Sequence, residues 1–195
     1  VNSPLIVQLG LFMEISNGEF TELGEQLVLP LFEGCGKPPN NSLSGLSRSQ
    51  RGLVRDALAS GGFDGKKGKR MTLWTPGCNI ILVGMGAKES LGHKRSRNTG
   101  ARLIASMSKK KGLDVTVRFT SGWPSKRMID FAEGMMLRDY EFLSHQEIPD
   151  DHIGDPWRVE FQASSRHQER LSEGLSITHS IVGGVHLARD LGNEP

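Results

Sequence analysis

Two glycines follow an apolar run of the sequence, at a place where a phosphate-binding turn could form. Residues 80–83 are Ile-Ile-Leu-Val, and Gly84, Met85 and Gly86 come directly after them. Glycines after a buried strand allow backbone amides to approach an anion closely. A third glycine at the usual spacing would fall on Glu89, whose carboxylate repels phosphate. We therefore favour a tight strand-to-helix turn here, and keep nucleotide binding as the alternative.

The histidines are the natural candidates for metal ligands. The sequence contains six histidines, of which His179 and His186 lie two turns apart on one predicted helix. A zinc site needs three or four ligands that converge, and no acidic or sulfur ligand lies at a matching spacing. Asp150, Asp151 and His152 are adjacent, and this pattern is typical of a solvated acidic patch. We therefore predict no metal-ligand residues in this chain.

Candidate nucleophiles are equally sparse. Ser44 and Ser121 are each followed by a glycine but lack the preceding glycine that a nucleophile elbow requires. Cys35 and Cys78 are too few and too far apart for a disulfide framework or a zinc cluster, which favours a reduced, intracellular protein. The sequence thus predicts no catalytic and no cofactor-binding residue.

Charge does not single out a polyanionic partner. The net charge is +2, but basic residues gather at 66–70, 94–97 and 109–111. Solvated loops or helix ends are the favoured interpretation of these clusters, and a DNA contact is the alternative. Lys109, Lys110 and Lys111 precede Gly112, as expected at the negative end of a helix dipole. No apolar run is long enough to cross a bilayer, and no secretory signal is visible.

The elements that would position these residues alternate between strands and helices. Apolar runs predict strands at residues 5–9, 26–29, 70–74, 80–83, 113–119 and 157–161, with a loop around Asn17 and Gly18. Helical spacing predicts helices at residues 49–59, at 98–111, after Pro124, and from a capping box of Ser165 with Gln168. This order predicts an α/β fold with a mixed, largely parallel sheet flanked by helices.

Two of these elements carry more detailed expectations. Residues 113–119 alternate apolar and polar side chains, which predicts a strand with one wet face near a sheet edge. The last helix should bury one apolar face, formed by Leu171, Leu175, Thr178, Val182, Val185 and Ala188.

Two stretches of the chain resemble the leucyl aminopeptidase (cytosol aminopeptidase) family. Residues 132–142, Ala-Glu-Gly-Met-Met-Leu-Arg-Asp-Tyr-Glu-Phe, are similar to a helix of the family's accessory domain, with a Gly, a Leu and then Tyr-x-Phe. Residues 186–195, His-Leu-Ala-Arg-Asp-Leu-Gly-Asn-Glu-Pro, resemble the Ala-Arg-Asp-Leu-x-Asn-x-Pro signature at the junction with the catalytic domain. Residues 81–86 match a strand and turn of the family, and the three stretches keep its order.

The resemblance implies a single N-terminal accessory domain over residues 1–195, with a macro-domain-like three-layer sandwich and an interdomain helix at about 165–192. Gly134 would then permit close helix packing, Tyr140 and Phe142 would anchor a helix end, and Arg189 and Asp190 would pair or cap. The family's two divalent metal ions, Mn or Zn, and its catalytic residues belong to the larger C-terminal domain, which is absent from this sequence. No catalytic residue is therefore carried over.

What the resemblance implies for function concerns the whole protein. Family members are cytoplasmic, usually homohexameric exopeptidases that release N-terminal residues such as leucine from peptides. We expect this chain to be inactive alone, to have the catalytic domain as its partner, and to serve hexamer assembly and active-site access. The alternatives are a DNA-binding or regulatory domain and a nucleotide- or ADP-ribose-binding module; no membrane contact is expected.

Overall fold

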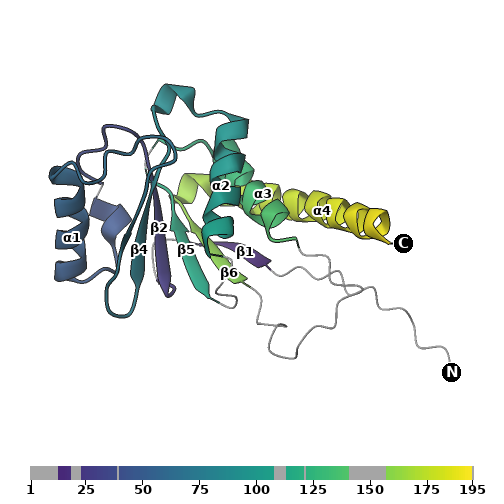
Figure 1. Ribbon diagram of the computed structural model, residues 1–195, viewed down its shortest axis with the longest axis horizontal. Coiled ribbons are helices and arrows are strands. Elements are labelled where there is room, and N and C mark those ends of the chain that lie inside the picture. The colour runs from purple at the N-terminus through teal and green to yellow at the C-terminus, as the bar shows by residue number, and fades with distance from the viewer. Residues whose placement is uncertain are drawn as a thin grey trace.

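The computed structural model describes residues 13–18, 23–38, 40–107, 113–120, 122–140 and 157–194 (Figure 1). Six strands of this part of the chain form one sheet: β1 Met13–Gly18, β2 Gln26–Leu31, β3 Arg70–Leu73, β4 Asn79–Gly84, β5 Asp114–Arg118 and β6 Trp157–Gln162. The helices are α1 Arg48–Ala59, α2 His93–Met107, α3 Ser125–Arg138 and α4 Gln168–Asn193, with short 3₁₀ turns at Asn40–Leu43, Lys88–Ser90 and Ser165–His167.

The sheet is mixed and largely parallel, as predicted. Its strand order is β1-β6-β5-β2-β4-β3. Every described pair of neighbours is parallel except β3 with β4, which is antiparallel at the edge. The continuous apolar runs of β2 and β4 lie side by side in the sheet, with Val28 opposite Ile81. Such runs suit strands that are covered on both faces.

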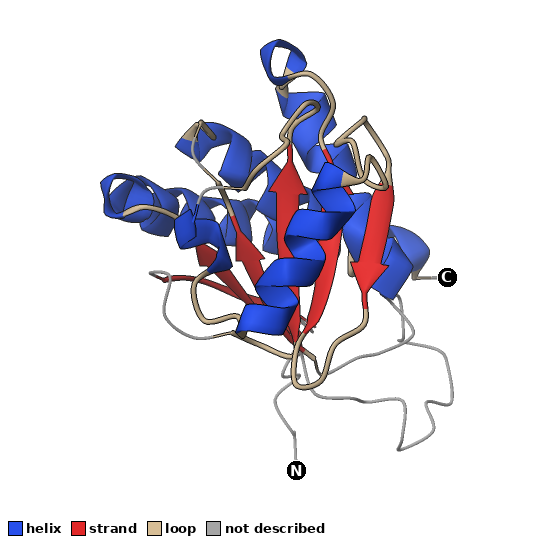
Figure 2. Cartoon of the chain, turned by 90° about the vertical axis from the view of Figure 1, so that its left-hand side faces the viewer, coloured by secondary structure: helices blue, strands red, loops and turns tan. Residues whose placement is uncertain are grey.

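Helices cover both faces of the sheet, so that the domain has three layers (Figures 1 and 2). Alternate residues of β2 and β4 divide between two cores because strand side chains point to opposite faces. Leu27, Leu29 and Leu31 pack with Val54 and Leu58 of α1. The other face, which includes Val28 and Ile81, packs under α2, α3 and α4. The predicted α/β sandwich is therefore confirmed.

The first described strand was not predicted. Asn17 and Gly18, expected in a loop, are the last two residues of β1. Gln168 holds this strand end in place: its side-chain nitrogen donates to the Gly18 carbonyl oxygen at 2.7 Å, and its side-chain oxygen accepts from Asn17 at 2.6 Å. The turn chemistry of Asn-Gly is thus overridden by a contact from α4. The strand predicted at residues 5–9 lies outside the described residues.

Strand β5 lies inside the sheet, between β6 and β2, so the predicted edge strand with a wet face was wrong. Two of its polar side chains, Thr116 and Arg118, are buried with partners. Thr116 accepts a hydrogen bond from the Gly24 amide at 2.9 Å, and Arg118, which is fully buried, donates to Gln162 and to the Ser44 carbonyl oxygen. Burial lowers the pKa of Arg118 to about 10, while Glu160 opposes this shift, so the guanidinium keeps its charge at neutral pH.

Two helix starts also differ from the prediction. A capping box does occur in the chain, but it is formed by Ser47 and Gln50 at the start of α1. Ser165 instead begins a 3₁₀ turn, because the side chain of Gln168 is engaged with β1 and with the Ala163 carbonyl oxygen. Helix α2 begins at His93, five residues before the predicted start at residue 98.

Helix α4 is apolar on two faces. Leu171, Leu175, Thr178 and Val182 are buried as predicted, but His186 completes this face in place of Val185, which is half-buried, and Ala188, which is exposed. The face turns towards His186 because its ring packs against Tyr140 after α3, with ring centroids 5.1 Å apart. On the other side of α4, four large apolar residues are exposed: Ile177, Ile181, Leu187 and Leu191. Among the described helices, none is long and apolar enough to span a membrane.

Candidate functional site

The Gly84–Met85–Gly86 turn does not bind anions through its backbone. The amide of Gly84 donates to the Lys69 carbonyl oxygen, that of Met85 to Leu31 and that of Gly86 to Gly65, at 2.8–2.9 Å. Gly86 has a φ of 73°, in the left-handed region that favours glycine. All three amides are engaged, so this segment is the structural strand-to-helix turn that the sequence favoured.

The predicted histidine pair is not brought together as a ligand set. His186 is buried next to Tyr140, whereas His179 is exposed. Burial, with a contribution from Arg189, lowers the pKa of His186. The two cysteines are free thiols whose pKa values are raised by burial, so neither is an activated nucleophile. Asp150, Asp151, His152 and Ser121 lie outside the described residues.

One group of possible metal ligands was missed by the sequence analysis. His93 of α2 meets Asp130 and Glu133 of α3, with their ligand atoms within 4.8 Å of one another. His93 Nδ1 lies 2.8 Å from an Asp130 oxygen. However, Arg127 pairs with the second Asp130 oxygen, and Arg97 lies 3.4 Å from Glu133. Two guanidinium groups therefore neutralise the two carboxylates, and the group is an ion-pair network between α2 and α3.

A serine–histidine pair at the start of α3 is also unsuited to catalysis. Ser125 Oγ and His167 Nδ1 are 2.8 Å apart. Arg166 donates to His167 Nε2 at 3.0 Å, so Nε2 must be the acceptor and Nδ1 must carry the proton. His167 then donates to Ser125 and cannot remove its proton. Ser44, the other described candidate, contributes a carbonyl oxygen to Arg118.

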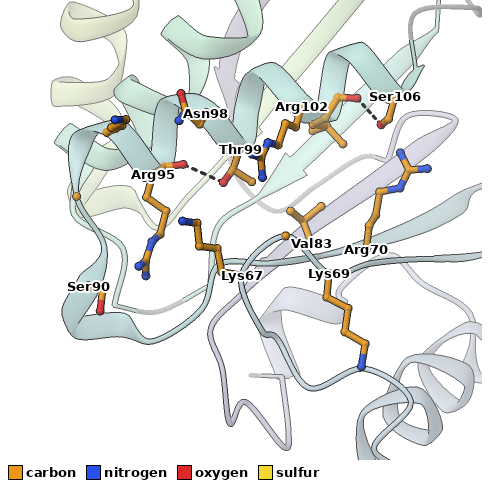
Figure 3. A pocket seen from close by; sticks show the side chains of 14 residues that line it. Lys67, Lys69, Arg70, Val83, Ser90, Arg95, Asn98, Thr99, Arg102 and Ser106 are labelled. Carbon is orange, nitrogen blue, oxygen red and sulfur yellow. Dashed lines mark hydrogen bonds between the residues drawn. The ribbon is translucent and has the colours of Figure 1, made fainter.

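A basic pocket lies at the β3 edge of the sheet. It has a volume of 490 Å³ and lies between α2 and the turn that leads into β3 (Figure 3). Six cationic side chains line it and no carboxylate does: Lys67, Lys69, Arg70, Lys94, Arg95 and Arg102. The sequence clusters at 66–70 and 94–97, interpreted as separate solvated segments, thus meet at one site. The cluster at 109–111 lies outside the described residues.

The cations approach the pocket from two elements. Lys67 points towards the Arg95 side chain, which runs down from α2 beside it, and Arg102 points towards Lys67 from two turns further along α2 (Figure 3). Arg95 is half-buried because its guanidinium donates to the carbonyl oxygens of Met85 and Ala87 at 3.3 and 3.1 Å. Lys69 points away and lies 3.4 Å from Asp64. The spacing of Arg95 and Arg102, seven residues apart on a helix, is the sequence signal that could have indicated a shared face.

The fold and this site together define a three-layer α/β domain with a basic pocket at one sheet edge and an uncovered apolar face on its last helix. The sequence comparison then gives the family. The model for "Cytosol aminopeptidase family, N-terminal domain" matches residues 28–147, which is more than half of the chain. The chain belongs to the cytosol aminopeptidase family, so the family resemblance is confirmed; the matched region includes residues 132–142.

Individual relatives agree with this assignment. The chain is 24% identical over 195 residues to a probable cytosol aminopeptidase of Burkholderia orbicola, covering 92% of this chain and 37% of the relative. It is 27% identical over 177 residues to one from Cyanothece sp., covering 86% and 35%. The chain thus spans a little over a third of the length of these relatives.

Two solved structures share the fold. A mutant of tomato leucine aminopeptidase superposes with a TM-score of 0.68 at 21% identity, covering 94% of this chain and 38% of that one. The bottromycin maturation enzyme BotP in complex with Mn gives a TM-score of 0.55 at 18% identity, covering 88% and 32%. In both cases the shared portion is about a third of the larger chain.

Proposed function

We propose that this chain is the accessory domain of a cytoplasmic metallo-aminopeptidase that releases N-terminal residues such as leucine from peptides, and that it has no peptidase activity alone. Its partner is a C-terminal catalytic domain that holds two divalent ions, Mn or Zn, and these ions supply an activated water. Family membership supports the activity class. Within the described residues, the one group of possible ligands is already neutralised by Arg97 and Arg127.

The observation that carries the accessory role is the second apolar face of α4. Ile177, Ile181 and Leu191 are 61%, 58% and 67% exposed, while the opposite face of the same helix packs into this domain's core. A helix that is apolar on both sides is typical of one buried between two bodies. The C-terminal end of α4 also extends beyond α3, away from the sheet (Figure 1). We infer that the catalytic domain covers this face and that α4 is the interdomain helix.

The function that we propose for this non-catalytic domain is assembly of the hexamer. A homohexamer would place this α/β sandwich where it can stabilise subunit contacts and restrict access of peptides to the active sites. DNA binding is the second candidate, favoured by the two basic clusters that meet at one pocket. Binding of nucleotides or ADP-ribose through the Gly84–Gly86 turn has no such support, because its amides are engaged.

Hydrolysis of leucine p-nitroanilide tests the proposal. The purified chain should show no turnover with or without added Mn²⁺ or Zn²⁺, whereas the full-length protein should be active with metal. In the full-length protein, Ile181→Asp should lower the melting temperature, because it places a charge in the face that the catalytic domain covers. The same substitution in the isolated chain should change stability little. Metal-dependent turnover by the isolated chain would contradict the proposal.

A further inference from the structure

We propose that the basic pocket between α2 and β3 binds a compact anion with two or more phosphate groups. The pocket has a volume of 490 Å³ and is lined by six lysine and arginine residues, of which Lys69 points away, in a protein whose net charge is only +2. Lysine and arginine are fully charged at neutral pH. Like charges around a cavity repel one another, and a bound anion offsets this repulsion. Phosphate oxygens are suitable acceptors for guanidinium donors.

Most of these charges are not neutralised by the described protein. Lys69 lies near Asp64, but the described part of the chain gives no ion pair to Lys67, Arg70, Lys94 or Arg102. Arg95 is fixed by two backbone carbonyl oxygens, so its guanidinium is positioned in advance. A preorganised donor loses less conformational entropy when a ligand binds.

The start of α2 at His93 supports an anion site. Because the helix begins at His93, Lys94 and Arg95 stand in its first turn, and no acidic residue does. The first-turn amides lack helical partners and form the positive end of the helix dipole. Cations at this end oppose the local preference for acidic side chains. An anion in the pocket removes the conflict, since it meets the side chains and the helix end together.

Glycines bring the backbone close to the cations. A side chain at Gly86 would meet Lys67 Cβ at 3.1 Å and the Arg95 guanidinium at 3.3 Å, and one at Gly68 would lie 3.8 Å from the Arg102 guanidinium. The backbone at Gly86 and Gly68 therefore lies next to Lys67, Arg95 and Arg102. No aromatic side chain lines the pocket, so it offers no stacking platform for a base. Charge, not a nucleobase, must be what the pocket recognises.

Calorimetry with inorganic tripolyphosphate as the probe tests the proposal on the chain. Tripolyphosphate should bind at least about tenfold more tightly than orthophosphate, because each charge-assisted hydrogen bond adds roughly that factor. Its affinity should fall as salt increases. ATP should match tripolyphosphate within about threefold, since the base finds no partner. Lys67→Gln and Arg102→Gln should each weaken tripolyphosphate binding by about tenfold.

Lys66→Gln is the matched control, because Lys66 is adjacent to Lys67 and equally charged but pairs with Asp64 at 3.3 Å and does not line the pocket. It should change the affinity by less than about twofold. Circular dichroism should show that all three variants remain folded. Equal affinities in the three variants, or no binding of tripolyphosphate at low salt, would overturn the proposal. A short DNA duplex that binds about tenfold more tightly than tripolyphosphate, and loses this affinity in Lys67→Gln, would also overturn it in favour of a nucleic-acid surface.

Discussion

Tyr140 and Asp190 are joined by a hydrogen bond of 2.8 Å, although 50 residues separate them in the chain. Tyr140 follows α3 and Asp190 belongs to the last turns of α4. Arg189 lies over the Tyr140 ring at 5.2 Å and donates to the Leu137 carbonyl oxygen, and the His186 ring packs beside it. The two sequence stretches that carry the family resemblance are therefore in contact, and their shared residues fix how α4 leaves the domain.

We predict that this contact stabilises the domain. Tyr140→Phe removes the hydroxyl group that donates to Asp190 and should lower the urea midpoint of the chain. Asp190→Ala should do the same by removing the acceptor. In the double variant the second substitution should cost less than it does alone, because the two groups act through one bond. Urea denaturation of the four proteins measures this coupling, and strictly additive effects would contradict the prediction.

Gly134, the one glycine of α3, should be hard to replace. A Cβ at this position would overlap the Arg97 carbonyl oxygen of α2, and one at Gly100 would overlap the Phe131 carbonyl oxygen from the other side. Gly134→Ala should therefore destabilise the chain by about 1–3 kcal/mol, as overpacking does. Gly52 of α1 has open space around it, so Gly52→Ala is the control and should stabilise by about 0.5–1 kcal/mol. Thermal or urea unfolding gives both values; equal effects would exclude backbone crowding.

Elements that bury apolar side chains were predicted well from the sequence. Elements that bury polar side chains were not. The apolar runs of β2 and β4 correctly predicted strands inside the sheet, because every side chain in these runs favours burial. The prediction that β5 lies at an edge was wrong because an alternating pattern indicates which side chains share a face. It does not indicate whether that face is exposed to solvent. Arg118 is buried only because Gln162 and two loop carbonyl oxygens lie within reach, and these partners are distant in the sequence.

The basic pocket shows the same limitation for function. The clusters at 66–70 and 94–97 were visible as charge, but their convergence depends on the crossover that places α2 beside the β3 edge. The predicted start of α2 at residue 98 also left Lys94 and Arg95 outside the helix. The His93–Asp130–Glu133 group could not be found for a similar reason, since the crossing of α2 with α3 forms it.

The buried face of α4 should belong to this domain's own core. Leu175 is 5% exposed and belongs to the hydrophobic core that includes Val28 and Ile81. Ile177, two positions further on, is 61% exposed. Leu175→Ala should cost about 2–5 kcal/mol in the isolated chain because it leaves a cavity. Ile177→Ala should change the unfolding free energy by less than about 0.5 kcal/mol. Urea denaturation compares the two; a small effect at Leu175 would assign the whole helix to a partner.

Acidification should destabilise the domain through His186. Burial, together with Arg189, lowers its pKa in the folded state, while Asp190 and the backbone of Met136 act in the opposite direction. In the unfolded chain, the pKa of histidine is about 6.5. Below that pH the unfolded state binds a proton that the folded state does not, so stability is complete above about pH 7 and is lost as the pH falls towards the folded pKa.

His186→Phe should make this loss smaller, because a phenyl ring fills the site beside Tyr140 without titrating. His167, whose pKa is lowered by burial and by Arg166 and Arg170, should contribute in the same direction, so His167→Gln should also flatten the profile. Urea unfolding at about pH 7.5 and about pH 5.5 measures the difference. If His186→Phe loses as much stability between these pH values as the unsubstituted chain, the buried imidazole is not the group that senses the proton.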